Sequence, residues 1–297
     1  MTLWAALVAV ACSGSVRDIQ EPGEGVQFEL VLNVAGERYL VDQPVKVYVG
    51  VKNVGKAGST EDIELYPNMT LALELSGPDS AWIPYKFGRM ITSGYGPGAT
   101  FRGVGAGQTA LLEYDLRGAD AEKKLLDKPG KWKLRAHYGG LKAGPVEFSV
   151  EEPGGRDVAA HVALGKMGFM LGKYGAGGWG QEITGPLPRF LADHAGSGYA
   201  PDAAMSLGSA LAESGMAGRE AEVDEGAKLL ARFDTEWATH QQAPRAMLVQ
   251  AKIARHRGKD NDDREAACAI LKRLEEKHPL FACTQDFIKL RKELEKK

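Results

Sequence analysis

Apolar and polar residues alternate along several short stretches in the first half of the chain. Between Val26 and Val34, every second residue is apolar. A period of two is typical of a β-strand with one buried face. The same pattern recurs, with turn-forming residues between, at residues 45–53, 70–75, 109–116, 131–138 and 146–150. No helical period intervenes, so the pattern predicts an antiparallel β-sandwich over residues 24–151.

The period changes after residue 151. Residues 152–156 are rich in proline and glycine and form a predicted linker, and beyond them apolar residues recur every three to four positions. Helices are expected at residues 157–174, 188–194, 200–214, 219–239, 244–257, 262–277 and 284–296. In the first helix, Val158, Val162 and Leu164 are expected to pack inward. The connections are short, which favours antiparallel helical hairpins over residues 157–297. The predicted fold class is therefore multidomain β + α.

Three motifs in the first half resemble those of bacterial exported immunoglobulin-like domains. Val41-Asp42-Gln43-Pro44-Val45 opens an early strand, Gly105-Ala106-Gly107-Gln108 precedes a strand ending in Tyr114-Asp115-Leu116, and Lys128-Pro129-Gly130-Lys131-Trp132 opens a late one. The resemblance covers residues 26–150 and implies an immunoglobulin-like sandwich. Some members of that family are appended to secreted peptidases and some inhibit peptidases, but no inhibitory or catalytic motif carries over to this chain.

The second half resembles degenerate tetratricopeptide repeats. Residues 190–208 resemble the junction between two such repeats in bacterial envelope proteins. Ala267, Leu271, Leu274 and Pro279 stand where the second helix of a repeat has small, large, small-or-apolar and proline residues. The resemblance implies hairpins stacked side by side. Both an open solenoid and a compact capped helical domain fit the two or three irregular units present.

The first residues have the pattern of an export signal. A short apolar run ends in Ala9-Val10-Ala11, the type of site that signal peptidases cleave, and Cys12 follows immediately. This arrangement resembles the lipobox of bacterial lipoproteins, which implies lipid attachment at Cys12. Residues 1–23 are therefore expected to be an export signal and linker, with lipidation and simple secretion both open. The apolar run is too short to span a membrane.

Chain length and charge narrow the possible domain organisation and partner classes further. A chain of 297 residues suits two modest domains. The 37 basic and 39 acidic residues are nearly balanced and form no basic stripe, so a nucleic-acid partner is not expected. Membrane contact is expected only through the N-terminal anchor. Outside the N-terminal run, the cysteines are Cys268 and Cys283, which could form a disulfide or remain two separate thiols.

No motif for catalysis, cofactor binding or metal binding stands in a suitable context. Gly175, Gly177 and Gly180 fit a dinucleotide-binding string, but they follow a predicted helix rather than a strand. Residues 259–263 are acidic but lack the glycine and glutamate of a calcium loop. The six histidines have no metal-ligand spacing. We therefore predict no catalytic, cofactor or metal residues.

Residues 77–107 are the candidate recognition segment. They show little alternation and combine aromatic residues and arginines, which are common interface anchors, with glycines and prolines. The alternative is that the rings cap one end of the sandwich core. The candidate partner-binding residues are Trp82, Tyr85, Phe87, Arg89, Tyr95, Phe101 and Arg102.

These observations together predict a non-catalytic cell-envelope protein that binds protein partners. The expected surfaces are the recognition segment and a groove between the helical hairpins. Two other classes remain open. One is a peptidase inhibitor or accessory domain, and the other is an enzyme or carbohydrate binder with a site at the domain junction.

Overall fold

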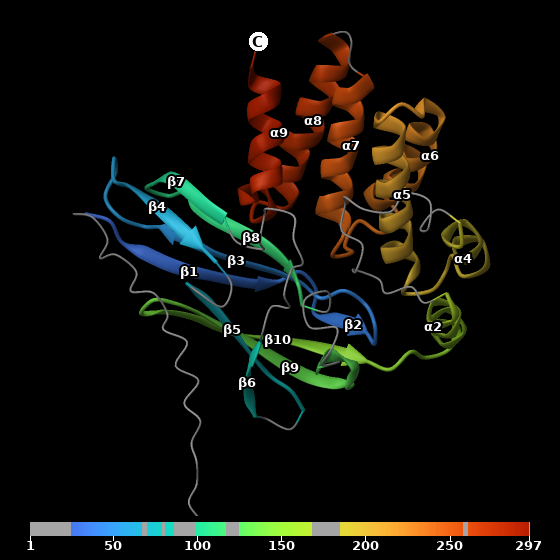
Figure 1. Ribbon diagram of the computed structural model, residues 1–297, viewed down its shortest axis with the longest axis horizontal. Helices are drawn as coiled ribbons and strands as arrows, with labels where there is room; N and C mark the ends of the chain where they lie inside the picture. The colour runs from blue at the N-terminus through green and yellow to red at the C-terminus, as the bar shows by residue number, and fades with distance from the viewer. Residues whose placement is uncertain are drawn as a thin grey trace, which may run out of the picture.

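A computed structural model describes residues 25–66, 70–78, 81–85, 99–116, 125–167, 185–257 and 261–296. Cys12 and the glycine string at 175–180 lie outside these residues. We call residues 25–151 the β module and residues 156–296 the helical module. Figure 1 shows the helices α5 to α9 above one face of the strands, with a second layer of strands on the far side. The structure thus has the β + α composition that the sequence predicts.

The strands of the β module form three sheets. Their hydrogen-bonded orders are β1-β3-β8, β2-β10-β9-β5-β6 and β4-β7. The strands are β1 (Phe28–Val34), β2 (Arg38–Leu40), β3 (Lys46–Asn53), β4 (Thr60–Leu65), β5 (Leu71–Ser76), β6 (Trp82–Tyr85), β7 (Ala99–Gly105), β8 (Thr109–Asp115), β9 (Gly130–Tyr138) and β10 (Leu141–Glu151). A 3₁₀ turn, η1 (Leu125–Asp127), precedes β9.

The helical module is built mainly from hairpins. The pairs α5/α6 and α7/α8 pack together, and α5, α7 and α9 lie next to one another in that order. The helices are α2 (Arg156–Lys166), α4 (Leu187–Asp193), α5 (Ala200–Met216), α6 (Glu220–Ala231), α7 (Ala243–Arg257), α8 (Asn261–Lys277) and α9 (Gln285–Glu295), with 3₁₀ turns η2 (Arg232–Asp234) and η3 (Phe281–Cys283). None of the helices in the described ranges is long and apolar enough to cross a membrane.

Strand β3 is buried on both of its faces. Val47, Val49 and Val51 point into the core of the β module, as the alternation predicts. On the opposite face, Tyr48 packs beneath the helices, where its ring meets that of Phe281 edge-on at a centroid distance of 6.1 Å. Leu111 of β8 joins the same cluster and is fully buried. The helical module therefore covers the outer face of the β1-β3-β8 sheet with an apolar contact.

Four strands were missed by the sequence pattern. They are β2, β4, β6 and β7, and the last two lie inside residues 77–107, where the sequence shows little alternation. Short strands with a proline or glycines, such as Trp82–Tyr85, carry too little alternation to register. The prediction of a wholly antiparallel arrangement is also wrong, because β2 pairs in parallel with the end of β10.

Two helix predictions need correction. The helix expected over 219–239 ends at Ala231, and the chain then turns so that the buried ring of Phe233 packs against Trp237 and His240. In α2, Val158 and Val162 are exposed at 48% and 49%, whereas Leu164 and Ala160 form the buried face. The alanine rather than the valines faces the neighbouring helices because it shares one side of the helix with Leu164, four positions on. Cys268 and Cys283 are free thiols, so they form no disulfide.

Candidate functional site

The predicted recognition residues do not form one surface among the described residues. Trp82 and Tyr85 lie on β6 of the five-stranded sheet, whereas Phe101 and Arg102 lie on β7 of the β4-β7 pair. Tyr85 is buried in the core, and its hydroxyl donates to the carbonyl of Leu116. It is therefore a core residue and not an exposed anchor. The other three predicted residues, Phe87, Arg89 and Tyr95, lie outside the described residues.

Of these residues, Trp82 takes part in a polar cluster on the outer face of its sheet. The guanidinium of Arg135 lies 4.1 Å from the Trp82 ring centroid. Arg135 also donates to Glu74 at 2.5 Å, and His137 lies 2.7 Å from the same carboxylate oxygen. The hydrogen bond from Arg135 is the main reason that the pKa of Glu74 is lowered. These side chains bind one another across β6, β5 and β9 and stabilise the outer face of the sheet.

Three helices begin at the surface of the β module. Tyr199, just before α5, donates its hydroxyl to the carbonyl of Val41 at 2.6 Å. Gln241, just before α7, donates to the carbonyl of Pro44 at 2.7 Å. Thr284, just before α9, forms a β-bridge with Leu111 of β8. Because all three helices start at the same surface, α5, α7 and α9 run outward side by side in the same direction, as Figure 1 shows.

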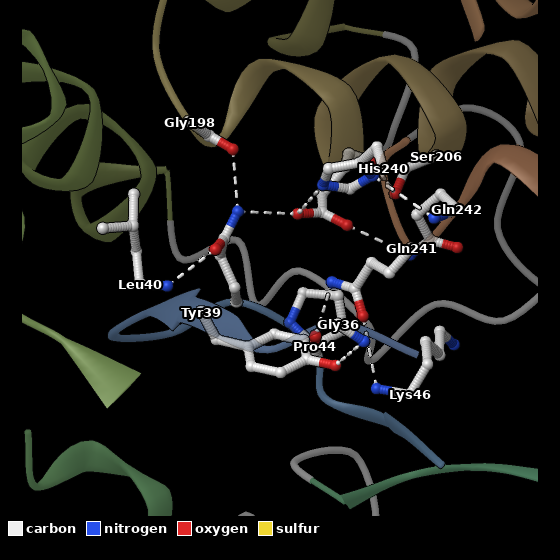
Figure 2. Close-up of polar contacts among 12 residues, drawn as sticks. Gly36, Tyr39, Leu40, Pro44, Lys46, Gly198, Ser206, His240, Gln241 and Gln242 are labelled. Carbon is white, nitrogen blue, oxygen red and sulfur yellow. Dashed lines mark hydrogen bonds and ion pairs between the residues drawn. The ribbon is translucent and has the colours of Figure 1, made fainter. Parts of the chain in front are cut away.

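A buried carboxylate lies at the centre of this junction. Asp202, in the first turn of α5, is only 1% exposed. Its Oδ2 accepts from Gln43 Nε2 at 3.0 Å and lies 3.7 Å from Nε2 of His240, and its Oδ1 accepts from Gln242 Nε2 at 3.1 Å. Figure 2 shows Gly198, His240, Gln241 and Gln242 grouped around this point. One carboxylate therefore joins the β module to two helix starts.

The side chain of Gln43 is held by three hydrogen bonds. Its Nε2 donates to Asp202 and, at 2.7 Å, to the carbonyl of Gly198, while its Oε1 accepts from the backbone amide of Leu40 at 2.7 Å. Rotating the amide by half a turn would point Oε1 at the oxygens of Asp202 and Gly198 and Nε2 at the amide of Leu40, so all three bonds would be lost. The orientation of Gln43, and hence the donor offered to Asp202, is fixed by the backbone around it.

The pKa values of Asp202 and His240 are shifted mainly by their burial. Loss of water raises the pKa of Asp202 and lowers the pKa of His240, and each group partly offsets the shift of the other. The ring Nδ1 of His240 accepts from the backbone amide of Gln242 at 3.3 Å, so in the neutral ring the proton is on Nε2, toward the carboxylate. The first turn of α5 adds a favourable helix dipole.

A second set of charges lies at the edge of the same interface. Glu113 of β8 is within 3.7 Å of Lys46 and 3.5 Å of Arg245. Although burial favours the neutral acid, these two cations hold the pKa of Glu113 below its ordinary value. Arg245 also reaches Asp286 at the start of α9, at 3.2 Å. The edge network therefore connects β3, β8, α7 and α9.

Two crevices flank the junction, with volumes of about 410 and 330 Å³. Thr239, His240 and Gln241 line both of them. The side chain of Gln241 donates to Pro44 and accepts from the amide of Lys46 at 3.3 Å, and His240 faces Asp202. The side chains of Gln241 and His240 are thus directed at other residues of the interface, where they help to dock the two modules.

A larger hollow of about 510 Å³ lies on the helical module, away from these buried contacts. It runs along α7 and α9 and reaches the end of α5. We call it the helix groove. Its lining residues are Met216, Lys252, Arg255, His256, Asp286, Lys289, Leu290 and Glu293.

Two interhelical ion pairs mark the ends of the helix groove. Arg245 pairs with Asp286 near the β module, and Arg255 pairs with Glu293 nearer the chain terminus. Arg255 stands ten positions after Arg245, a separation of about 15 Å along a helix. The helix groove is therefore a charged, open channel of about that length between two helices.

Comparisons with known proteins assign no family. No protein-family model matches the chain, and no curated protein matches it. Among solved structures, β-glucosidase 3B from Thermotoga neapolitana in complex with glucose is 14% identical, with a TM-score of 0.26. That match covers 42% of this chain and only 16% of the glucosidase.

Two further matches are equally distant. An immunoglobulin-like protein from Pseudomonas aeruginosa is 13% identical, with a TM-score of 0.22, and the match covers 43% of this chain and 100% of that one. An alkylpurine DNA glycosylase from Pseudomonas fluorescens, bound to DNA, is 16% identical over 43% of this chain and 30% of its own, with a TM-score of 0.23. Scores this low carry no argument about fold or activity.

Replacing Asp202 by asparagine should destabilise the protein even though the side chains have the same shape. Both carboxylate oxygens accept from glutamine amides, so the new amide group must face one of those donors. We expect a loss of about 1–3 kcal/mol in the free energy of unfolding, measured by urea denaturation. Asp157→Asn is the matched control. That side chain accepts one bond, from the amide of Gly198, which the asparagine oxygen can keep. Equal stability of the two variants would contradict this role for Asp202.

Acidification should also weaken the fold through His240. Because burial lowers its pKa from the ordinary 6.5, the unfolded chain binds a proton more readily than the folded protein. The contribution is complete above pH 6.5 and is lost as the pH falls toward the folded value. The raised pKa of Asp202 has the opposite effect on stability, because its contribution is lost as the pH rises above the ordinary value of 3.8. Between pH 7.5 and 6, the free energy of unfolding of the wild-type protein should fall relative to that of His240→Gln, so the substitution should change the slope of stability against pH. An unchanged slope would exclude His240 as its source.

Proposed function

We propose that this chain is a non-catalytic cell-envelope protein that binds other proteins and acts as a scaffold. On this proposal the β module is an immunoglobulin-like sandwich and the helical module a degenerate tetratricopeptide-like array. The motifs at Val41-Asp42-Gln43-Pro44-Val45 and Lys128-Pro129-Gly130-Lys131-Trp132 support the first resemblance. The hairpins α5/α6 and α7/α8, with Ala267, Leu271 and Leu274 all buried, support the second.

The observation that carries the proposal is the helix groove. Helices α5, α7 and α9 lie side by side, and the hollow along them is open and lined by both charged and apolar side chains. Grooves of this kind between stacked helices suit an extended segment of another protein. The junction crevices offer less, because Gln241 and His240, which line both of them, already bind other residues of the interface.

Rigidity supports a scaffolding role. The helical module contacts the β module through the apolar cluster around Tyr48, Leu111 and Phe281 and through the buried bonds of Asp202. A groove held on a fixed base keeps its shape without a partner, which lowers the ordering cost of binding. The two modules are therefore proposed to present their surfaces as one unit.

Site-specific photocrosslinking tests the helix groove as a protein-binding surface. A photoreactive benzoylphenylalanine at Met216, a partly exposed apolar position of the groove, should give discrete protein adducts in bacterial cells that express the full chain. The same residue at Lys272, an exposed position of α8 outside the groove lining, is the matched control and should give none. Adducts of equal yield from both positions, or from neither, would count against the proposed function.

We further propose, from the sequence, that the protein is exported and anchored through a lipid on Cys12. The support is the Ala9-Val10-Ala11 cleavage pattern followed directly by that cysteine. An anchor of this kind would hold the scaffold at the membrane surface.

Phase partitioning tests the anchor. The intact protein should enter the detergent phase, because a lipid chain adds a large apolar surface, and Cys12→Ala should move it to the aqueous phase. Immunoblotting of the two phases measures the distribution. If both proteins partition alike, the anchor proposal fails while the groove proposal stands.

A further inference from the structure

The charges of the helix groove are not balanced. Its two carboxylates are both paired, Asp286 with Arg245 and Glu293 with Arg255. Lys252 of α7 and Lys289 of α9 also line it, and within the described residues neither has a carboxylate within ion-pair distance. Two lysines therefore remain in the groove after its acidic side chains are satisfied.

These lysines lie between the two ion pairs. Lys252 stands seven residues after Arg245 and three before Arg255, and Lys289 stands three after Asp286 and four before Glu293. Both thus lie between the two ends of the channel, one on each helix wall, with Lys252 nearer the Arg255–Glu293 end. Lys252 is half-buried and Lys289 is exposed. A cation on a partly buried wall attracts an anion more strongly than one fully in water.

Nearby groups offset this charge only in part. His256 lies 3.1 Å from Glu220 of α6, which draws its ring to that side. Glu213 of α5 interacts electrostatically with Lys252 without forming an ion pair. Glu213 therefore opposes an anionic ligand at Lys252, and its removal should favour such a ligand.

The remaining lining is apolar. Met216 at the end of α5 is partly exposed, whereas Leu290 of α9 is only 2% exposed and packs in the core beneath the groove. A channel of about 15 Å holds four or five residues of an extended chain, at about 3.3 Å per residue. Carboxylates suit the two lysines, and an apolar side chain suits Met216.

We propose that the helix groove binds an acidic, extended segment of a protein partner, with carboxylates on Lys252 and Lys289. This inference rests on the proposed function, because it names the chemistry of the partner at the same surface.

Labelled peptides test the chemistry directly. Three fluorescein-labelled peptides of equal length, made of glutamate and leucine, glutamine and leucine, or lysine and leucine, are titrated with the full chain, and binding is followed by fluorescence anisotropy. The glutamate peptide should bind tightest. The double variant Lys252→Gln/Lys289→Gln should weaken its binding about tenfold, from two partly screened charge contacts. Glu213→Gln should strengthen it about twofold.

The control removes the same charge elsewhere. Lys228 on α6 and Lys272 on α8 are exposed and do not line the groove, so Lys228→Gln/Lys272→Gln should change binding by less than about twofold if the effect is local rather than due to net charge. Urea denaturation of each variant confirms that folding is retained.

The outcomes separate this inference from the proposed function. If the glutamine or lysine peptide binds as tightly as the glutamate peptide, if none binds, or if the two double variants behave alike, the acidic-partner proposal is overturned. Discrete crosslinks from position 216 would still support the groove as a protein-binding surface in those cases. Absence of crosslinks would remove the proposed function itself.

Discussion

The carboxylate of Asp202 is the constraint on which the arrangement of the two modules depends. A charge with 1% exposure is costly to bury, and the cost is offset only when donors surround it. Here the donors come from Gln43 in the β module and from Gln242 before α7, with His240 beside them. Removing any one segment leaves a buried charge short of partners. The apolar contact around Tyr48 and Phe281 supplies area without direction, so the carboxylate is what makes one docking geometry preferable to its neighbours.

This docking also determines the shape of the helix groove. Arg245 contacts Glu113 of β8 and Asp286 of α9 at once, so the residue that ties α7 to the β module also closes the near end of the groove. The contacts made by Tyr199, Gln241 and Thr284 attach the starts of α5, α7 and α9, respectively, to one surface of the β module. These helices therefore run in the same direction. In this fold the interface and the groove are two ends of the same helices. A change that loosens the interface should therefore alter the groove before the β module unfolds.

Local periodicity predicts the strands and helices because each depends on residues close in sequence. The alternation at Val47, Val49 and Val51 identifies the core face of β3 correctly. Apolar residues also occur on the other face of this sheet, where they break the alternation: Tyr48 on β3, Val31 on β1 and Leu111 on β8. They were the signal in the sequence that a second layer covers the sheet. They could not say which helices provide the cover, because that depends on contacts such as Tyr48 with Phe281 that join distant parts of the chain. The strand Trp82–Tyr85 was missed because its four residues are too few to show an alternating pattern.

The candidate site was harder to predict because its charges meet only in the folded chain. In the sequence, Asp202 follows Ala200-Pro201 and is no different from an ordinary first-turn aspartate, yet its partner Gln43 is 159 residues away. Spacing along α9 does place Asp286, Lys289 and Glu293 on one side of the helix, three and four residues apart. It does not show that Asp286 and Glu293 are neutralised by arginines 41 and 38 residues earlier. With both carboxylates paired to arginines in the folded protein, the lysines are the charges of this face that have no ion-pair partner among the described residues. The proposed preference for an acidic partner therefore follows from the fold rather than from composition.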